Sequence, residues 1–199
     1  MLIGFTYDLR EDYLNAGFTD EQAGEFDVIE TIEAVEAALR RHGHEVERIG
    51  GIKALVPALA AGRRWPLVWN MCEGVSGIAR EAQVPALLEA YGIPFVFSTA
   101  DVLVTAMDKA MAKLAVRAAG VPTPDFVVVR TARDLQAVKL SYPLFVKPLA
   151  EGTSKGVKET SKVTSRAQLT AKALEVLRAS HPPALVEPFL PGREFTVRL

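Results

Sequence analysis

The chain has 199 residues and a formal net charge of −1, with 49% hydrophobic and 24% charged residues. This length suits one large or two small globular domains, and the balanced charge gives no reason to expect nucleic acid or an acidic membrane surface as a partner. The single cysteine, Cys72, excludes an internal disulfide and favours a reducing, cytoplasmic setting, and no apolar run approaches the roughly 20 residues needed to cross a bilayer.

Short apolar segments alternate with helically spaced segments from residue 2 to residue 97. This order is typical of an open parallel sheet covered by helices, in which functional loops lie beyond the carboxyl ends of the strands. The polar segment 8–24, which we expect to be an irregular loop, and the glycine-bearing segment 71–77 both lie there. The expected strands are 2–6, 45–49, 67–70 and 94–97, and the expected helices are 26–42, 52–61 and 82–91.

The pattern becomes less regular after residue 100, which predicts a second domain of the α+β class. Asp108 is a good N-cap for the helix that follows it, and Pro122 and Pro124 force an extended link after that helix. The last residues look like a strand still in progress, so we expect the chain to be the front part of a longer protein. The expected helices are 108–119, 132–138 and 166–179, and the expected strands are 126–129, 143–147, 184–186 and 194–199.

An apolar strand ends in Lys147 and leads into a loop of small residues, 149–156, that contains two glycines. Glycine lets backbone N–H groups approach phosphate oxygens closely, Lys147 supplies a positive charge, and Thr153 and Ser154 supply hydroxyl donors. The segment lacks the G-x-x-x-x-G-K-[ST] pattern of a P-loop. It therefore indicates another kind of phosphate site, and the alternative is a glycine-rich hairpin with a solvent-facing lysine.

Two further segments carry charge where a nucleotide would need it. Lys109 lies in the first turn of a helix, where a positive charge opposes the helix dipole unless an anion offsets it. Glu187 and Glu194 flank a proline-bearing link whose backbone groups can hydrogen-bond a flat base, and an acidic side chain can accept from ribose hydroxyls. The alternatives are a solvated lysine and a surface turn with two solvated glutamates.

The segment 70–83 follows a strand and is dense in polar groups. Glu73, Arg80 and Glu81 suit a small zwitterionic ligand, whereas the alternative is that Glu81 favours a helix start and Arg80 pairs with a neighbour. Cys72 is interpreted as a small buried residue, because no neighbouring histidine supports a thiol nucleophile. No spacing of ligand residues along the chain predicts a metal site.

These segments, taken in order, resemble the D-alanine–D-alanine ligase family of the ATP-grasp superfamily. The resemblance covers nearly the whole chain and is most specific from Met107 to Val197. Five strings in register are much harder to obtain by chance than one. They are MDK at 107–109, GVPTPDF at 120–126, FVKPLAEGTSKG at 145–156, SKV at 161–163 and LVEPFLPGREFTV at 185–197.

The resemblance implies a division of the chain into three parts and a set of site residues. The parts are a pre-ATP-grasp α/β substrate domain over 1–100, a central α+β ATP-grasp subdomain over 101–185, and over 186–199 the hinge and first strand of a C-terminal ATP-grasp subdomain whose remainder is missing. The matched positions are Lys109 and Lys147 for ATP phosphates; Glu151, Gly152, Thr153 and Gly156 for the phosphate-covering loop; Ser154 for its catalytic, substrate-side serine; Glu187 and Leu190 for adenine; Glu194 for ribose; and Glu73, Arg80 and Glu81 for the substrate-side loop.

The implied activity is ATP-dependent ligation of a carboxylate to an amine through an acylphosphate, with ATP and two small amino acids as ligands and a homodimer as a possible assembly. The family's magnesium ligands are expected beyond Leu199, so we expect this chain to lack turnover. The family's glycine- and serine-rich loop after the first strand is replaced by the long acidic segment 7–24, which leaves the first amino acid open. The alternatives are a natural short protein that binds a nucleotide or a partner without catalysis, and a dinucleotide-binding protein, whose G-x-G-x-x-G is absent after the first strand.

Overall fold

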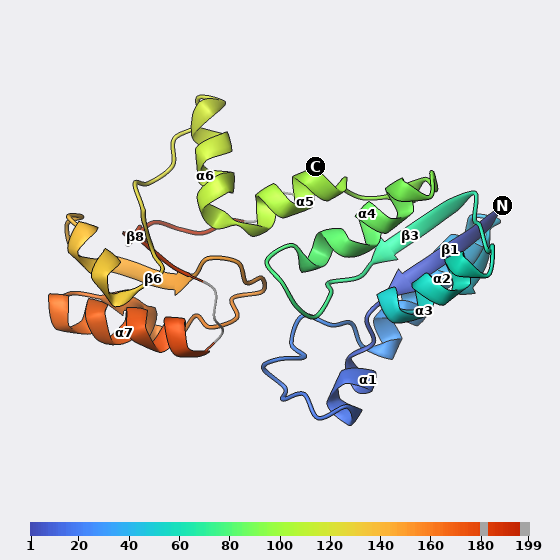
Figure 1. The fold of residues 1–199 in the computed structure, drawn as a ribbon, viewed down its shortest axis with the longest axis horizontal. Helices are drawn as coiled ribbons and strands as arrows, with labels where there is room; N and C mark the ends of the chain where they lie inside the picture. The colour runs from blue at the N-terminus through green and yellow to red at the C-terminus, as the bar shows by residue number, and fades with distance from the viewer. Residues whose placement is uncertain (180–182, 196–199) are drawn as a thin grey trace. The chain divides into compact units, whose positions relative to one another are not determined.

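The computed structural model describes residues 1–179 and 183–195, and the chain divides into two compact units, Met1–Met107 and Asp108–Leu199 (Figure 1). The break falls at the N-cap of a helix, so the preceding helix belongs to the first unit. The finer three-part division implied by the resemblance stays a prediction. No helix within the described residues has the length and apolar character required to cross a membrane.

The first unit contains a four-stranded sheet in the order β2-β1-β3-β4, and all three pairings are parallel. The strands predicted from the sequence are confirmed, with shifts of one or two residues at their ends. The segments after β1 and β3 leave the sheet at the same edge, as the parallel arrangement requires. The strands are β1 Leu2–Tyr7, β2 Glu45–Arg48, β3 Leu67–Met71 and β4 Phe95–Val96.

The helices of the first unit include two that the sequence did not predict. The segment 8–24 was expected to be irregular, but it contains α1, where Glu11 and Asp12 in the first turn complement the helix dipole. The other unpredicted helix, α5, follows β4 directly. The helices are α1 Arg10–Asn15, α2 Ile29–Arg41, α3 Ile52–Ala60, the 3-10 turn η1 Arg80–Ala82, α4 Gln83–Ala90 and α5 Ala100–Met107.

The core of the first unit joins α3 and α4 to one face of the sheet. Leu55 and Leu59 of α3, Val68 of β3 and Leu88 of α4 are fully or almost fully buried in one cluster. Side chains alternate along a strand, so Ile3 and Phe5 of β1 serve the opposite face, and both are buried. The apolar run of β1 therefore reflects burial on both faces, as expected of an inner strand of a parallel sheet.

The second unit contains an antiparallel sheet in the order β5-β8-β6-β7, with helix α7 packed against it. The predicted α+β class is confirmed. The expected strand 194–199 was placed on residues of which 196–199 lie outside the described part, and 194–195 are not in a strand. The elements are α6 Lys109–Ala118, β5 Val127–Val129, the 3-10 turn η2 Ala132–Ala137, β6 Leu144–Pro148, the 3-10 turn η3 Glu159–Ser161, β7 Lys162–Val163, α7 Arg166–Ala179 and β8 Ala184–Pro188.

A single apolar cluster fills the space between this sheet and α7. Leu144 and Val146 alternate with outward-facing residues along β6, and Leu169, Ala173 and Val176 form the buried stripe of α7. The alternation on β6 leaves Lys147 on the face away from this cluster. The core of the second unit thus decides which face of β6 can meet a polar ligand.

Candidate functional site

A cluster of three charged side chains lies on the sheet of the second unit. The carboxylate of Glu187, on β8, accepts from Lys147 Nζ of β6 at 2.6 Å and from Lys113 Nζ of α6 at 2.7 Å. Glu187 and Lys113 are largely shielded from solvent, and Lys147 is three-quarters shielded. Burial alone would raise the pKa of Glu187, but the two ammonium groups outweigh burial and lower it. The Glu187 carboxylate is therefore held ionised between two ammonium groups.

Lys109 connects the start of α6 to the loop that follows β6. Its backbone N–H donates to the carbonyl of Leu149 at 3.2 Å, and its Nζ donates to the carbonyls of Leu149 and Glu151 at 3.3 and 2.5 Å. Asp108 caps the helix, because its Oδ1 accepts from the N–H groups of Ala110 and Met111, and this confirms the predicted N-cap. The lysine that opposes the helix dipole is thus directed to the glycine-bearing loop.

The loop after β6 has backbone conformations that few side chains adopt. Thr153 and Ser154 have φ values of 39° and 61°, and Gly156 has a φ of 74°. A Cβ added at Gly156 would lie 2.7 Å from Pro148 Cγ, so only glycine fits this return of the chain toward β6. Thr153 and Ser154 are exposed, and their hydroxyl groups are accessible to a ligand.

The remaining predicted ATP-side residues lie in the loop after β6 and in the segment after β8. Glu151 pairs with Lys155 at 3.3 Å within the loop, and Gly152 follows it. Leu190 is 64% exposed and Glu194 is exposed in the segment after β8. The structure therefore brings together Lys109, the loop and the Glu187 cluster, and their nucleotide roles, like those of Leu190 and Glu194, stay predictions.

Lys113 was not singled out from the sequence, although its spacing from Lys109 was a usable signal. Residues four apart lie on the same face of a helix, so two lysines at this spacing face the same neighbours. Here that face is directed at β8 and at the loop after β6. The partner, Glu187, lies 74 residues further along the chain, and helical spacing alone does not identify it.

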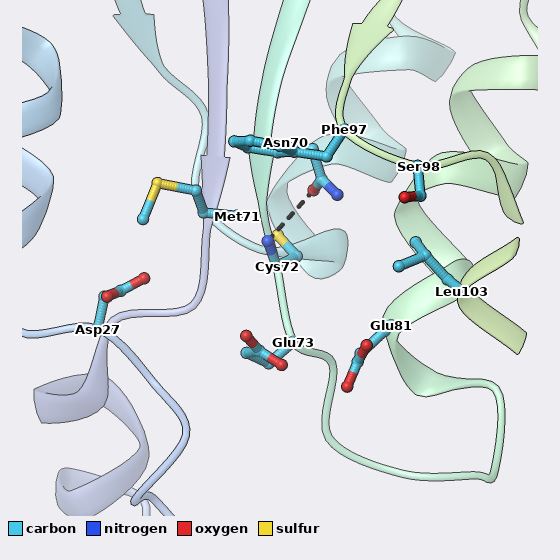
Figure 2. Close-up of a pocket in the computed structure, with 9 residues that line it drawn as sticks. All are labelled: Asp27, Asn70, Met71, Cys72, Glu73, Glu81, Phe97, Ser98 and Leu103. Carbon is cyan, nitrogen blue, oxygen red and sulfur yellow. Dashed lines mark hydrogen bonds between the residues drawn. The ribbon is translucent and has the colours of Figure 1, made fainter. Parts of the chain in front are cut away.

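A second candidate site is a cavity of about 350 Å³ at the carboxyl edge of the first unit's sheet. Figure 2 shows three carboxylate side chains at its wall, Asp27 from the segment before α2, Glu73 from the loop after β3, and Glu81 from η1. Among the described residues that line it, none is a lysine or an arginine. Two of the three predicted substrate-side residues, Glu73 and Glu81, therefore share one acidic cavity.

The third predicted substrate-side residue, Arg80, does not line this cavity. Its guanidinium donates twice to Glu25, at 2.9 and 2.8 Å, and both side chains are more than nine-tenths buried. Arg80 also lies 3.9 Å from Glu81. The alternative that Arg80 pairs with a neighbour is thus observed, and Glu25 is a partner that the sequence did not indicate.

The buried side chain of Asp8 fixes the loop that carries Glu73. Asp8 Oδ2 accepts from the N–H groups of Glu73 and Gly74 at 3.0 and 2.9 Å, and its Oδ1 accepts from the Tyr13 hydroxyl at 2.5 Å. A Cβ added at Gly74, whose φ is 69°, would lie 2.4 Å from the carbonyl oxygen of Arg80. The two loops that were expected to meet at this sheet edge are therefore joined by Asp8.

Two carboxyl groups of this cavity, those of Glu73 and Asp27, have raised pKa values. Burial, and then the neighbouring carboxylates of Glu81 and Glu25, raise the pKa of Glu73 from its ordinary 4.5 to about 7. Burial also raises the pKa of Asp27. Burial, and then the charge of Asp8, raise the pKa of the Cys72 thiol well above its usual value, which agrees with the predicted buried, unreactive cysteine. The cavity thus concentrates negative charge that the protein only partly neutralises.

The placement of the acidic side chains also bears on metal binding. Within residues 1–179 and 183–195, no group of three or more His, Cys, Asp and Glu side chains is placed to hold a metal ion. The acidic residues of the cavity therefore do not fit a metal centre in this part of the chain.

A family model and several named relatives match the sequence of this chain. A family model described as the D-ala D-ala ligase C-terminus matches residues 115–199. D-alanine–D-alanine ligase B of Xanthomonas campestris is 30% identical over 99% of this chain and 57% of its own length. The D-alanine–D-alanine ligase of Xanthomonas axonopodis is 32% identical over the same shares of the two chains. The chain thus spans somewhat more than half the length of these relatives.

Solved structures share the fold. The D-alanine–D-alanine ligase of Bacillus anthracis, solved in complex with ATP, has a TM-score of 0.72 at 24% identity, over 96% of this chain and 57% of that one. The VanG D-Ala:D-Ser ligase of Enterococcus faecalis has a TM-score of 0.70 at 20% identity, over 96% and 63% of the two chains. At this identity the likeness establishes the fold, and the predicted fold class is confirmed.

Proposed function

Because the chain belongs to the D-alanine–D-alanine ligase family of the ATP-grasp superfamily, we propose that the whole protein is an ATP-dependent ligase that joins the carboxylate of one small amino acid to the amine of another. The observation that carries this proposal is the cluster in which Lys147 and Lys113 hold Glu187, beside the loop that Lys109 contacts. Fixed positive charge next to a glycine-bearing loop is suited to the phosphates of ATP.

The lysines bind and orient the nucleotide in this proposal. An ATP phosphate competes with Glu187 for the ammonium group of Lys147, while Lys113 keeps the Glu187 carboxylate in place. Lys109 fixes the start of the loop, and the exposed hydroxyls of Thr153 and Ser154 donate to phosphate oxygens or to the reacting carboxylate. Glu187 and Leu190 hold adenine, and Glu194 accepts from ribose hydroxyls.

The proposed reaction has two steps, phosphoryl transfer and amide formation. A substrate carboxylate oxygen attacks the γ-phosphorus of ATP, the bond to the β-phosphate oxygen breaks, and ADP leaves an acylphosphate behind. The amine of the second substrate then attacks the acyl carbon, and phosphate departs with the carbonyl–oxygen bond electrons as the nitrogen loses a proton. Magnesium, whose ligands we place outside the described residues, supplies charge neutralisation between the phosphates when bound.

The acidic cavity of the first unit receives an amino-acid substrate in this scheme. Glu73 and Glu81 supply carboxylates to a substrate ammonium group, and Asp8 holds the loop that carries Glu73. Arg80 contributes through its pair with Glu25, which neutralises the guanidinium and keeps η1 in position. The cavity therefore selects a substrate by its amino group.

The test measures phosphate release by the whole protein with ATP, magnesium and a panel of D- and L-amino acids. We expect release above background only when a suitable amino acid is present, and loss of that release in Lys147→Met. The matched control is Lys139→Met, because Lys139 is exposed and is not part of the ion-pair cluster around Glu187. ATP binding without stimulation by any amino acid would contradict the ligase and favour a nucleotide-binding protein without catalysis.

A further inference from the structure

We propose that the cavity of the first unit binds a diamino acid, an amino acid that carries a second ammonium group on its side chain. The proposal rests on the proposed function in that this ligand is taken to be a substrate. It rests on two carboxylates that have no hydrogen-bond or ion-pair partner among the described residues, and on a buried amide whose nitrogen faces the same cavity. Together they define two sites for cations and one site for an acceptor.

The two carboxylates belong to Asp27 and Glu73. Neither side chain forms a hydrogen bond or an ion pair with any residue in the described part of the chain, 1–179 and 183–195. Glu81, which lines the same wall, adds a third negative charge, and Arg80 is already held by Glu25. A partly buried carboxylate without a partner costs free energy, and an ammonium group of a ligand removes that cost.

The amide of Asn70 supplies an independent indication of a ligand. Asn70 is 7% exposed, and its Oδ1 accepts from Thr6 Oγ1 at 2.9 Å and from the Cys72 N–H at 3.2 Å. These two donors fix the orientation of the amide, so its Nδ2 cannot be the atom that faces them. Within residues 1–179 and 183–195 the NH₂ group has no acceptor, and Figure 2 shows it directed to the side where Ser98 and Leu103 line the cavity.

The number and sign of these groups determine the class of ligand. A ligand with one ammonium group satisfies one of the two unpartnered carboxylates and leaves the other buried without a partner. A divalent metal ion does not fit, since no group of three suitable side chains is placed to hold one in the described part of the chain. A diamino acid offers two ammonium groups and a carboxylate that accepts from Asn70 Nδ2, and about 350 Å³ accommodates it.

Binding of this ligand should depend on pH through the ionisation of Glu73. Glu73 faces Glu81 and Arg80 of η1, Glu25 and Asp27 before α2, and Cys72 and Asp8 beside it. Burial, and then this mostly acidic surrounding, raise the pKa of Glu73 to about 7, so a proton must leave before an ammonium group can pair with the ionised carboxylate. Affinity therefore increases as the pH rises through 7, by roughly tenfold between pH 6 and pH 8.

Calorimetric titration of the 199-residue chain tests the proposal with ornithine, norvaline and putrescine as probes. Norvaline has the carbon chain of ornithine without the second amine, and putrescine has both amines without the carboxylate. We expect ornithine to bind about tenfold or more tightly than either, and to lose about tenfold in affinity in Asp27→Asn, Glu73→Gln and Asn70→Ala. Glu30→Gln, which removes an exposed carboxylate of α2, is the matched control and leaves the affinity unchanged.

Equal affinities for ornithine and norvaline would overturn the second ammonium site. Equal affinities for ornithine and putrescine would overturn the site at which Asn70 Nδ2 donates to the ligand carboxylate. Circular dichroism shows whether each variant is folded, and Asp27→Asn and Glu73→Gln change only one atom each. ATP affinity, measured on the same samples, separates the two proposals. Ornithine binding without any ATP binding contradicts the proposed function alone, whereas ATP binding without ornithine binding contradicts this inference alone.

Discussion

Two glutamates in this chain have opposite electrostatic surroundings. Glu187 is held by two lysine ammonium groups, which lower its pKa in spite of burial. Glu73 forms no ion pair with any lysine or arginine in the described part of the chain, and burial and neighbouring carboxylates raise its pKa to about 7. One glutamate, Glu187, is thus part of a cluster that attracts anions in the second unit. The other, Glu73, is part of a cavity that attracts cations in the first. The surroundings, and not the residue type, decide which ligand each site favours.

The largest expected effect on stability comes from removing the buried ion pair between Arg80 and Glu25 in the first unit. Arg80→Met removes the guanidinium that is paired with the buried Glu25 carboxylate and should lower the free energy of unfolding by about 3–5 kcal/mol. The exposed Arg40 provides the control, because its partner Glu36 keeps a second pair with Arg48, and Arg40→Met should cost about 0.5 kcal/mol or less. Urea unfolding measures both. Similar small losses for both variants would show that Arg80 is not essential to the cavity wall.

The next largest effect concerns the cluster of the second unit. Lys147→Met keeps most of the aliphatic stem but removes one of the two charges on Glu187, and it should weaken ATP binding by about 10- to 100-fold. Lys139→Met should leave ATP binding unchanged, since Lys139 is exposed. Fluorescence titration with an ATP analogue measures both affinities. A loss of equal size in the control variant would show that general charge, and not this cluster, attracts the nucleotide.

A smaller effect is expected at the joint between the two loops of the first unit. The two carboxylate oxygens of Asp8 accept from the Tyr13 hydroxyl and from the N–H groups of Glu73 and Gly74. Asp8→Asn keeps only one acceptor oxygen, so it should cost about 1–2 kcal/mol of stability. It should also weaken ligand binding in the cavity, because Glu73 is less firmly placed. Asp12→Asn, on an exposed position of α1, is the control and should stay within about 0.5 kcal/mol. Retained loop protection in hydrogen exchange of Asp8→Asn would exclude the positioning role.

The smallest effects are opposite pH dependences of stability. The folded-state pKa of Glu187 is lowered, so its contribution is present above its ordinary 4.5 and is lost as the pH falls through the lowered value. The folded-state pKa of Glu73 is raised, so its contribution is present below 4.5 and is lost as the pH rises toward 7. Glu73→Gln should therefore increase stability at pH 8 by about 1 kcal/mol, and Glu187→Gln should decrease it. Urea unfolding across pH 4 to 8 measures both, and changes of the same sign would contradict the contrast.

Local chemistry made much of the fold predictable from the sequence. The N-cap at Asp108, the strand that ends in Lys147 and the helix 166–179 follow from side chains within a few residues of one another. The meeting of the loops after β1 and β3 followed from the rule for parallel strands, and Asp8 makes that contact.

Long-range contacts were not predictable in the same way. Glu187 meets Lys113 only because β8 pairs with β6 and α6 packs nearby, and no periodicity reports a partner 74 residues away. The acidic cavity likewise depends on Asp27 and Arg80, whose positions are fixed by tertiary contacts. Arg80 was expected at a ligand and instead neutralises Glu25, because a buried carboxylate needs a charged partner.

The most direct test of the contrast is an ATP titration of the chain, followed by amide chemical shifts. We predict saturable shifts at Lys109, Lys147, the loop 149–156 and Glu187, with none at Asp27 or Glu73, and loss of the shifts in Lys147→Met. Saturable shifts confined to the cavity of the first unit, or an unchanged response in Lys147→Met, would contradict the assignment of the anion site to the Glu187 cluster.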